Sequence, residues 1–279
     1  MENTRVLFVC SEIVPYLSET SIATIGRELP QGIQDLGREI RTFMPRYGSI
    51  NERRNQLHEV IRLSGMNLII DDADHPLIIK VASISAARMQ IYFIDNEDYF
   101  QRKCLYRDDK GNFFPDNDER TIFFARGILE TVRKLRWSPD LVHCHGWFSC
   151  LLAIYLKKSY KDDPLYANSK IVLSIYDDGF DELFNENFKK KAVYSGVKPK
   201  DLEILSVPSY VNLMKLCVSY ADGVIAGSPQ INDELKQYIV NDSGVAFLDY
   251  QQPDNYIQAY SDFYDQVLSS KKKKRKTNL

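Results

Sequence analysis

The sequence lacks any apolar run that approaches the roughly 20 residues a membrane-spanning helix needs. Its first residues, MENTRVLFVCSE, lack the basic stretch and long apolar core of a secretory signal peptide. Cysteine is scarce: the five cysteines are scattered, odd in number and form no C-x-x-C pair. These absences argue against a membrane protein or a disulfide-stapled one, and they predict a cytoplasmic protein with reduced, buried thiols.

Glycine is missing where a nucleotide-binding loop would need it. The loop after the first apolar segment, SEIVPYLSETSIATIG, contains no glycine before Gly26. A dinucleotide site requires G-x-G-x-x-G directly after that strand, because side chains there would keep a pyrophosphate away from the backbone amides. No Walker motif occurs elsewhere in the sequence. We therefore expect no bound NAD or ATP, and no cofactor.

Apolar periodicity in the first fifty residues indicates a strand, a helix and a second strand. The run TRVLFVCSE (4–12) is typical of a buried strand, and apolar residues then recur at helical spacing from Ile22 to Leu36, before Gly37. The segment EIRTFMPRYG (39–48) supplies the next strand, which stops at proline and glycine. Together they predict a βαβ unit with parallel strands and a right-handed crossover.

The pattern changes at residues 57–94, where strand-like pieces follow one another with no helix between them. We expect an antiparallel excursion at the edge of the sheet. Helical periodicity returns at 116–135, capped by Asp116 or Asn117, and strands and helices then alternate to about residue 240. The sequence therefore predicts an α/β fold, a Rossmann-like and mostly parallel sheet with helices on both faces.

Residues 1–250 are expected to form one domain, with an amphipathic helix at 251–270 packed back on it. The remaining residues, 271–279, are expected to form a disordered basic tail. Its KKKKRK run either keeps the chain soluble or docks on acidic lipid or nucleic acid. The formal net charge of the whole chain is −2 and includes the six positive charges of this run. Without the run, the rest of the chain carries −8. An acidic body argues against nucleic-acid binding.

Two histidines lie two residues apart in LVHCHGWFSCLL (141–152), which contains half of the four histidines in the chain. On a strand, His143 and His145 would share one face, as two metal ligands could. A third and a fourth ligand at usual zinc spacing are missing, since Cys150 lies in the following helix. Contact with a sugar or phosphate, or a purely structural role in hydrogen bonding, are the alternatives, and we expect no metal.

A second polar cluster, YDDG (176–179), follows the strand near residue 170. Paired carboxylates can act as general acid and base. Neighbouring acids on a loop are more often solvated or used as caps, and both interpretations remain open at this point.

Five segments in order resemble bacterial glycogen synthases and plant starch synthases. They are VLFVCSEIVPY, GRELPQGIQDLGREIRTFMPRYGSI, FPDNDERTIFFARGILE, PDLVHCHGWFSCLLAIYL and YADGVIAGSP. The matching family patterns include S-E-x-x-P, M-P-x-Y, D-N-x-x-R-F-x-x-F, H-x-H-D-W and Y-A-D-x-V-x-x-V-S-P. The resemblance runs from about residue 4 to residue 240.

This resemblance implies the amino-terminal lobe of a GT-B glycosyltransferase, which holds an α-glucan acceptor and closes over ADP-glucose. A second lobe supplies most of the donor site in that family, so a separate second-lobe protein is a possible partner. The sugar-side residues that the resemblance implies are His143, His145, Trp147, Asn117 and Arg120.

Three departures from the family pattern affect catalytic positions. Gly146 stands where the family has the aspartate of H-x-H-D-W, and Tyr176 stands where it has a histidine. The phosphate loop K-T-G-G-L aligns with Ser18, Glu19, Thr20, Ser21 and Ile22. Loss of one well-placed transition-state stabiliser typically costs about 100- to 1,000-fold in rate.

Two functions follow from these residues. The first is a glucosyltransferase lobe of the glycogen or starch synthase type, weak or inactive alone. The second is a non-catalytic glucan-binding or scaffold protein, in which aromatics such as Tyr16, Tyr47 and Trp147 stack on sugars or pack in the core. If the carboxylate at 146 were the sole loss, Gly146→Asp should raise transfer activity.

Overall fold

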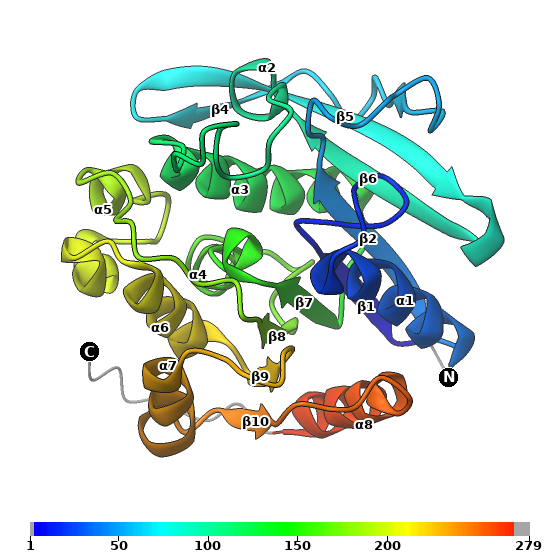
Figure 1. The fold of residues 1–279 in the computed structure, drawn as a ribbon, viewed down its shortest axis with the longest axis vertical. Coiled ribbons are helices and arrows are strands. Elements are labelled where there is room, and N and C mark those ends of the chain that lie inside the picture. The colour runs from blue at the N-terminus through cyan, green and yellow to red at the C-terminus, as the bar shows by residue number, and fades with distance from the viewer. Residues whose placement is uncertain (1–2, 271–279) are drawn as a thin grey trace.

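A computed structural model describes residues 3–270, and a single ten-stranded sheet organises them (Figure 1). The strands are β1 (Arg5–Val9), β2 (Glu39–Pro45), β3 (His58–Glu59), β4 (Met66–Ile70), β5 (Ala73–Ile84), β6 (Met89–Asp95), β7 (Leu141–His145), β8 (Lys170–Ile175), β9 (Gly223–Ala226) and β10 (Ala246–Leu248). Their spatial order is β10-β9-β8-β7-β1-β2-β6-β5-β3, and β4 pairs with β5.

The sheet is parallel from β10 to β6 and antiparallel beyond it. Each neighbouring pair between β10 and β6 runs in the same direction. β5 then pairs antiparallel with β6, and β3 and β4 pair antiparallel with β5. The predicted α/β fold, with a mostly parallel sheet and an antiparallel edge excursion, is confirmed.

Helices cover both faces of this sheet. The α-helices are α1 (Ser21–Asp35), α2 (Glu97–Phe100), α3 (Asn117–Leu135), α4 (Leu152–Lys158), α5 (Phe188–Lys191), α6 (Tyr210–Tyr220), α7 (Asp233–Gln237) and α8 (Tyr256–Ser269). Shorter turns are η1 (Ser85–Ala87), η2 (Trp147–Ser149), η3 (Pro199–Ser206) and the π-helical η4 (Tyr238–Asp242). Right-handed crossovers that leave the centre in opposite directions place α1 on one face and α3, α4 and α6 on the other. No helix among residues 3–270 combines the length and apolar character that a membrane crossing requires.

Local sequence explains where the helices begin and end. The Thr20 hydroxyl accepts a hydrogen bond from the Ala23 amide and caps α1, and Gly37 follows the helix with a φ of +91°. Asp116 is the cap residue of α3, as predicted, but its side chain makes no capping hydrogen bond. Its carboxylate instead pairs with Arg102 at 2.6 Å.

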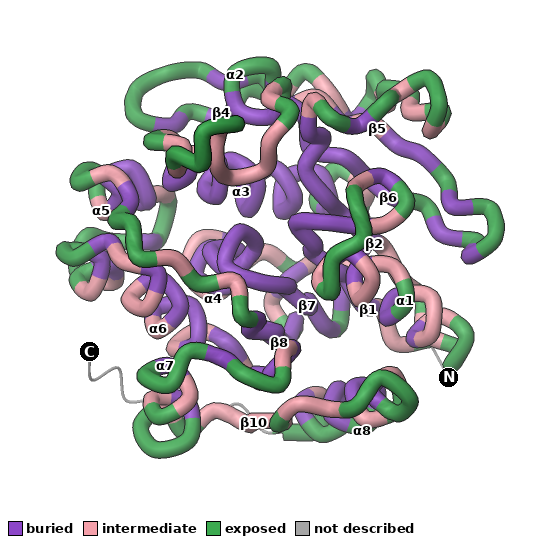
Figure 2. The backbone as a smooth tube through the Cα atoms, viewed as in Figure 1, coloured by how far each residue is buried: buried purple, intermediate pink, exposed green. Residues whose placement is uncertain are grey.

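The segment after β10 returns to the sheet. Helix α8 contacts β8 and α1, and the side chain of Ile257 fills the space beside Gly32 of α1. Figure 2 shows the buried residues along the strands and on the inner sides of the helices. The predicted domain limits stay a prediction, and the expected basic tail at 271–279 lies outside the described residues.

Candidate functional site

The candidate site lies where loops leave the carboxyl ends of β1, β7 and β8. The chain passes from β1 to β2 on one side, whereas β7 pairs with β1 on the other side. Connections therefore diverge at β1, and such a switch point leaves a crevice at the strand ends in which α/β proteins bind ligands. The loop of Ser18 to Ser21 follows β1, and Gly146 follows β7.

His143 and His145 share one face of β7, as the spacing predicts, and their ring centroids are 4.0 Å apart. His143 is fully buried. Its Nδ1 contacts the Tyr264 hydroxyl of α8 at 2.6 Å, and its Nε2 contacts the Ser174 hydroxyl at 2.8 Å. Both ring nitrogens therefore have hydrogen-bond partners within the protein, which favours a structural role for this histidine.

His145 is also fully buried, but only one of its nitrogens has a partner. Its Nδ1 contacts the Tyr176 hydroxyl at 2.7 Å, and its Nε2 has no hydrogen-bond partner among the described residues. Burial lowers the pKa of His145 to about 3. Burial, with a smaller contribution from His145, holds the pKa of His143 well below its ordinary value. Both imidazoles are thus neutral at pH 7.

Tyr176 closes the end of β7. Its ring is 1% exposed and stacks on His145 at a centroid distance of 6.1 Å. The ring also packs on Gly227 so closely that a Cβ added there would lie 2.5 Å from the Tyr176 ring. Tyr176 therefore fills the space between the ends of β7 and β9.

Gly146 meets a carboxylate that comes from the loop after the neighbouring strand β8. Its backbone has φ +71° and ψ 177°, a conformation essentially limited to glycine. A Cβ added at this position would lie 2.6 Å from Asp178 Oδ2. Asp178 accepts hydrogen bonds from the Trp147 amide at 3.3 Å and from the Tyr210 hydroxyl at 2.9 Å. Asp178, on the loop after β8, thus occupies the space that a side chain at 146 would enter.

The Asp178 carboxyl is half-buried, and burial raises its pKa from 3.8 to about 6, although its two donors act in the opposite direction. A carboxyl whose pKa is raised by folding contributes stability below pH 3.8 and loses it as the pH rises through 6. Asp178→Asn removes this dependence. We therefore expect the unfolding free energy of the variant, relative to wild type, to increase by about 2 kcal/mol between pH 4 and pH 7 in urea titrations. A pH-independent difference would contradict the burial argument.

Trp147 lies in an aromatic cluster and is 2% exposed. Its ring contacts those of Tyr106, Phe113, Phe180 and Phe184 at centroid distances between 4.8 and 6.1 Å. These partners come from the loops before α3 and after β8. Trp147 therefore packs the two loops together beside the end of β7.

Asn117 and Arg120 are fully buried at the start of α3. Arg120 donates to the carbonyl oxygens of Tyr99 and Leu105 and to the Asn117 side chain, at 2.6 to 2.9 Å. Asn117 in turn donates to the Tyr106 carbonyl. The pair fixes the chain between α2 and α3. Sugar contact by these residues, by Trp147 and by the histidines stays a prediction.

The loop at 18–21, which the sequence predicts to be a degenerate phosphate loop, is exposed. It contains Ser18, Glu19, Thr20 and Ser21. The Thr20 hydroxyl donates to the Glu12 carboxylate at 2.9 Å. Burial raises the pKa of Glu12, which is 8% exposed at the end of β1. The loop therefore presents a second carboxylate, Glu19, and no cation, which makes it a poor cradle for phosphate.

Sequence reasoning identified Gly146 but missed what lies beside it. Asp178 was noted as one of two loop acids, and the structure separates them, because Asp177 is exposed. Tyr210, at the start of α6, carried no motif that could have revealed its bond to Asp178. Among residues 3–270, no three His, Cys, Asp or Glu side chains gather in a way that could hold a metal ion.

Sequence comparison matches most of the chain to one family. The family model described as starch synthase catalytic domain matches residues 5–246. A glycogen synthase from Chlorobium limicola is 31% identical over 236 residues, which cover 84% of this chain and 47% of that protein. One from Chlorobaculum tepidum is 32% identical over 248 residues, covering 88% and 49%. The chain spans about half the length of these curated relatives.

A solved structure shares the fold. It is the catalytic domain of starch synthase IV from Arabidopsis thaliana, bound to ADP and acarbose. The TM-score is 0.71 at 16% sequence identity, and the match covers 91% of this chain and 53% of the other. At this identity the likeness establishes the fold of the lobe alone.

Proposed function

The chain belongs to the starch synthase catalytic domain family, and we propose that it serves in the family's reaction as the sugar-side lobe. In this reaction glucose passes from ADP-glucose to the end of an α-1,4-glucan. A second lobe outside these 279 residues, which would hold the donor, is part of the same proposal, as is a cytoplasmic location. We further propose that these residues alone transfer glucose weakly or not at all.

One observation carries the proposal of weak transfer. Tyr176 covers His145, and its hydroxyl uses the Nδ1 of this histidine at 2.7 Å. A residue that binds a sugar must offer exposed donors or acceptors, whereas both atoms of this pair are buried. Each lost stabilising contact in a transition state costs about 100- to 1,000-fold in rate, and the changes at 146, 176 and 18–21 act on the same reaction.

The same closure favours a second candidate function, a non-catalytic role. Of the three aromatics that the sequence offered for stacking on sugar, Tyr47 is fully buried, and Tyr16 and Trp147 are 7% and 2% exposed. Tyr16 packs edge-on against Phe93 at 4.9 Å, as a core residue does. This burial favours a scaffold that binds protein over one that binds glucan through these rings.

Incorporation of labelled glucose from ADP-glucose into glycogen tests the proposal. We expect the purified chain to give incorporation no higher than a protein-free blank, with the Chlorobaculum tepidum glycogen synthase as positive control. Addition of extract from cells that naturally make the protein should restore incorporation if a second lobe exists. Robust transfer by the purified chain would contradict the proposal that Tyr176 closes the site. Absence of transfer in both mixtures would contradict the role as a sugar-side lobe and would favour the non-catalytic scaffold.

A further inference from the structure

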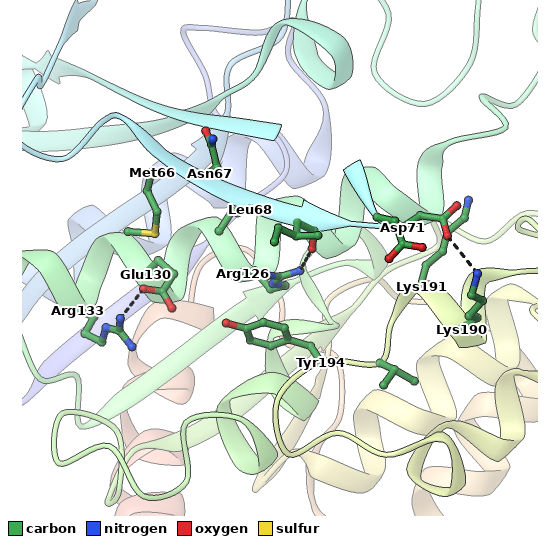
Figure 3. Close-up of a pocket in the computed structure, with 13 residues that line it drawn as sticks. Met66, Asn67, Leu68, Asp71, Arg126, Glu130, Arg133, Lys190, Lys191 and Tyr194 are labelled. Atoms are coloured by element: carbon green, nitrogen blue, oxygen red, sulfur yellow. Dashed lines mark hydrogen bonds and ion pairs between the residues drawn. The ribbon is translucent and has the colours of Figure 1, made fainter. Parts of the chain in front are cut away.

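A cavity of about 530 Å³ lies between the β4–β5 hairpin, α3 and the segment after α5 (Figure 3). It shares no residue with the site at the ends of β7 and β8. Its volume is within the range of pockets that hold small molecules. Four cationic side chains line it, namely Arg126, Arg133, Lys190 and Lys191, together with the carboxylates of Asp71, Asp72 and Glu130.

Arg126, in the middle of α3, is the most deeply buried of the four at 5% exposure. Its guanidinium lies over the Tyr194 ring at 3.8 Å, and one terminal nitrogen donates to the Ile69 carbonyl at 2.6 Å. Its Nε, also buried, has no hydrogen-bond partner among the described residues. Figure 3 shows the Arg126 guanidinium between β4 and Tyr194.

The other three cations have carboxylate partners. Arg133 pairs with Glu130 at 3.0 Å, and Lys190 pairs with Asp71 at 3.6 Å. Lys191 pairs with Asp118 and Glu119. Arg126 alone among the four has no carboxylate within 4.0 Å in residues 3–270.

A buried guanidinium without a counter-charge is costly, because it has lost its water and gained no anion in return. A donor that remains unpaired adds to this cost. An anion entering the pocket would supply both missing partners. The planar fork of an arginine matches the oxygens of a phosphate group.

We propose that this pocket binds a small molecule that carries a phosphate group, held by Arg126. The phosphate belongs either to inorganic phosphate or to the monoester of a small polar molecule such as a sugar. The pocket shares no residue with the candidate site at the strand ends, so binding is independent of whether the chain transfers glucose.

Titration of the wild-type protein with inorganic phosphate, and separately with glucose 1-phosphate, tests the proposal directly. We expect the Nε–H signal of Arg126 in ¹H–¹⁵N spectra, identified by its absence in Arg126→Lys, to shift saturably with phosphate. Tighter binding of the ester would identify a phosphorylated molecule as the ligand, and equal binding would identify phosphate itself. A signal that moves no more than in sodium chloride of equal ionic strength would overturn the proposal.

Arg126→Met and Arg133→Met form a matched pair on the same helix. Methionine keeps the apolar stem of Arg126 but removes the charge, so phosphate affinity should fall about 10- to 100-fold, the worth of one charged hydrogen bond. Arg133 is half-exposed and already paired, and its replacement should change affinity less than about threefold. Equal losses in both variants would overturn the specific role of Arg126. The wild-type titration stands if Arg126→Met does not fold.

Discussion

An aspartate in place of Gly146 should destabilise the protein by about 4 kcal/mol, and it should not raise glucosyl transfer. A non-glycine residue at φ +71° and ψ 177° carries backbone strain of about 1 to 3 kcal/mol. The new side chain would also start 2.6 Å from Asp178 Oδ2, so two carboxylates would compete for one half-buried space. Urea denaturation at pH 7, followed by tryptophan fluorescence, measures the loss.

Two further variants separate the causes of this loss. Gly146→Ala should show the backbone strain without the second charge. Gly146→Asp combined with Asp178→Ala should be less destabilised than the sum of its single changes by at least about 1 kcal/mol, because the carboxylates no longer meet. If the destabilisation of the double variant equalled the sum of the two single variants, a direct conflict between the side chains at 146 and 178 would be contradicted.

The geometry beside Gly146 changes what the sequence implied about this position. The sequence predicts a gain in transfer from Gly146→Asp only if the missing carboxylate at 146 is the sole loss. The structure shows a carboxylate already present in that space, delivered from the loop after β8 and held by the Trp147 amide and the Tyr210 hydroxyl. The double variant, and not the single one, is therefore the informative probe of transfer activity.

Periodicity predicted the long elements of the fold because their pattern is local. Strand β1 and helix α1 each bury a face that the sequence displays as an apolar run or as helical spacing from Ile22 to Leu36. The lack of helical pattern at 57–94 likewise predicted the antiparallel strands. Short elements such as α5 and β10, with four and three residues, carry too little pattern and were missed.

The side-chain contacts of the site could not be predicted in the same way. The spacing of His143 and His145 placed both rings on one face of β7, but nothing local said which groups would cover them. His145 meets Tyr176 from the next strand, 31 residues away, and His143 meets Tyr264, 121 residues away. Such partners depend on the register of neighbouring strands and on where α8 returns, which only the tertiary fold fixes.

Replacing His145 by glutamine should remove the loss of stability that this buried histidine causes at acid pH. Folding depresses the pKa of His145 from 6.5 to about 3, so its contribution to stability is complete above pH 6.5 and is lost as the pH falls toward 3. Over that whole interval the unfolding free energy falls by about 5 kcal/mol, because the histidine binds a proton in the unfolded chain but stays neutral in the folded chain. Glutamine does not titrate and can still bond the Tyr176 hydroxyl.

At pH 7 the glutamine variant should be less stable than wild type, since it loses the ring contacts of His145 with Phe8 and His143. Between pH 7 and pH 4 the difference should move in favour of the variant by about 3 kcal/mol in urea titrations. Asp178→Asn is the matched control. Because folding raises the pKa of the Asp178 carboxyl, the stability of this variant relative to wild type should increase as the pH rises, which is the opposite direction. If both variants changed in the same direction, opposite pKa shifts at these two neighbouring groups would be ruled out.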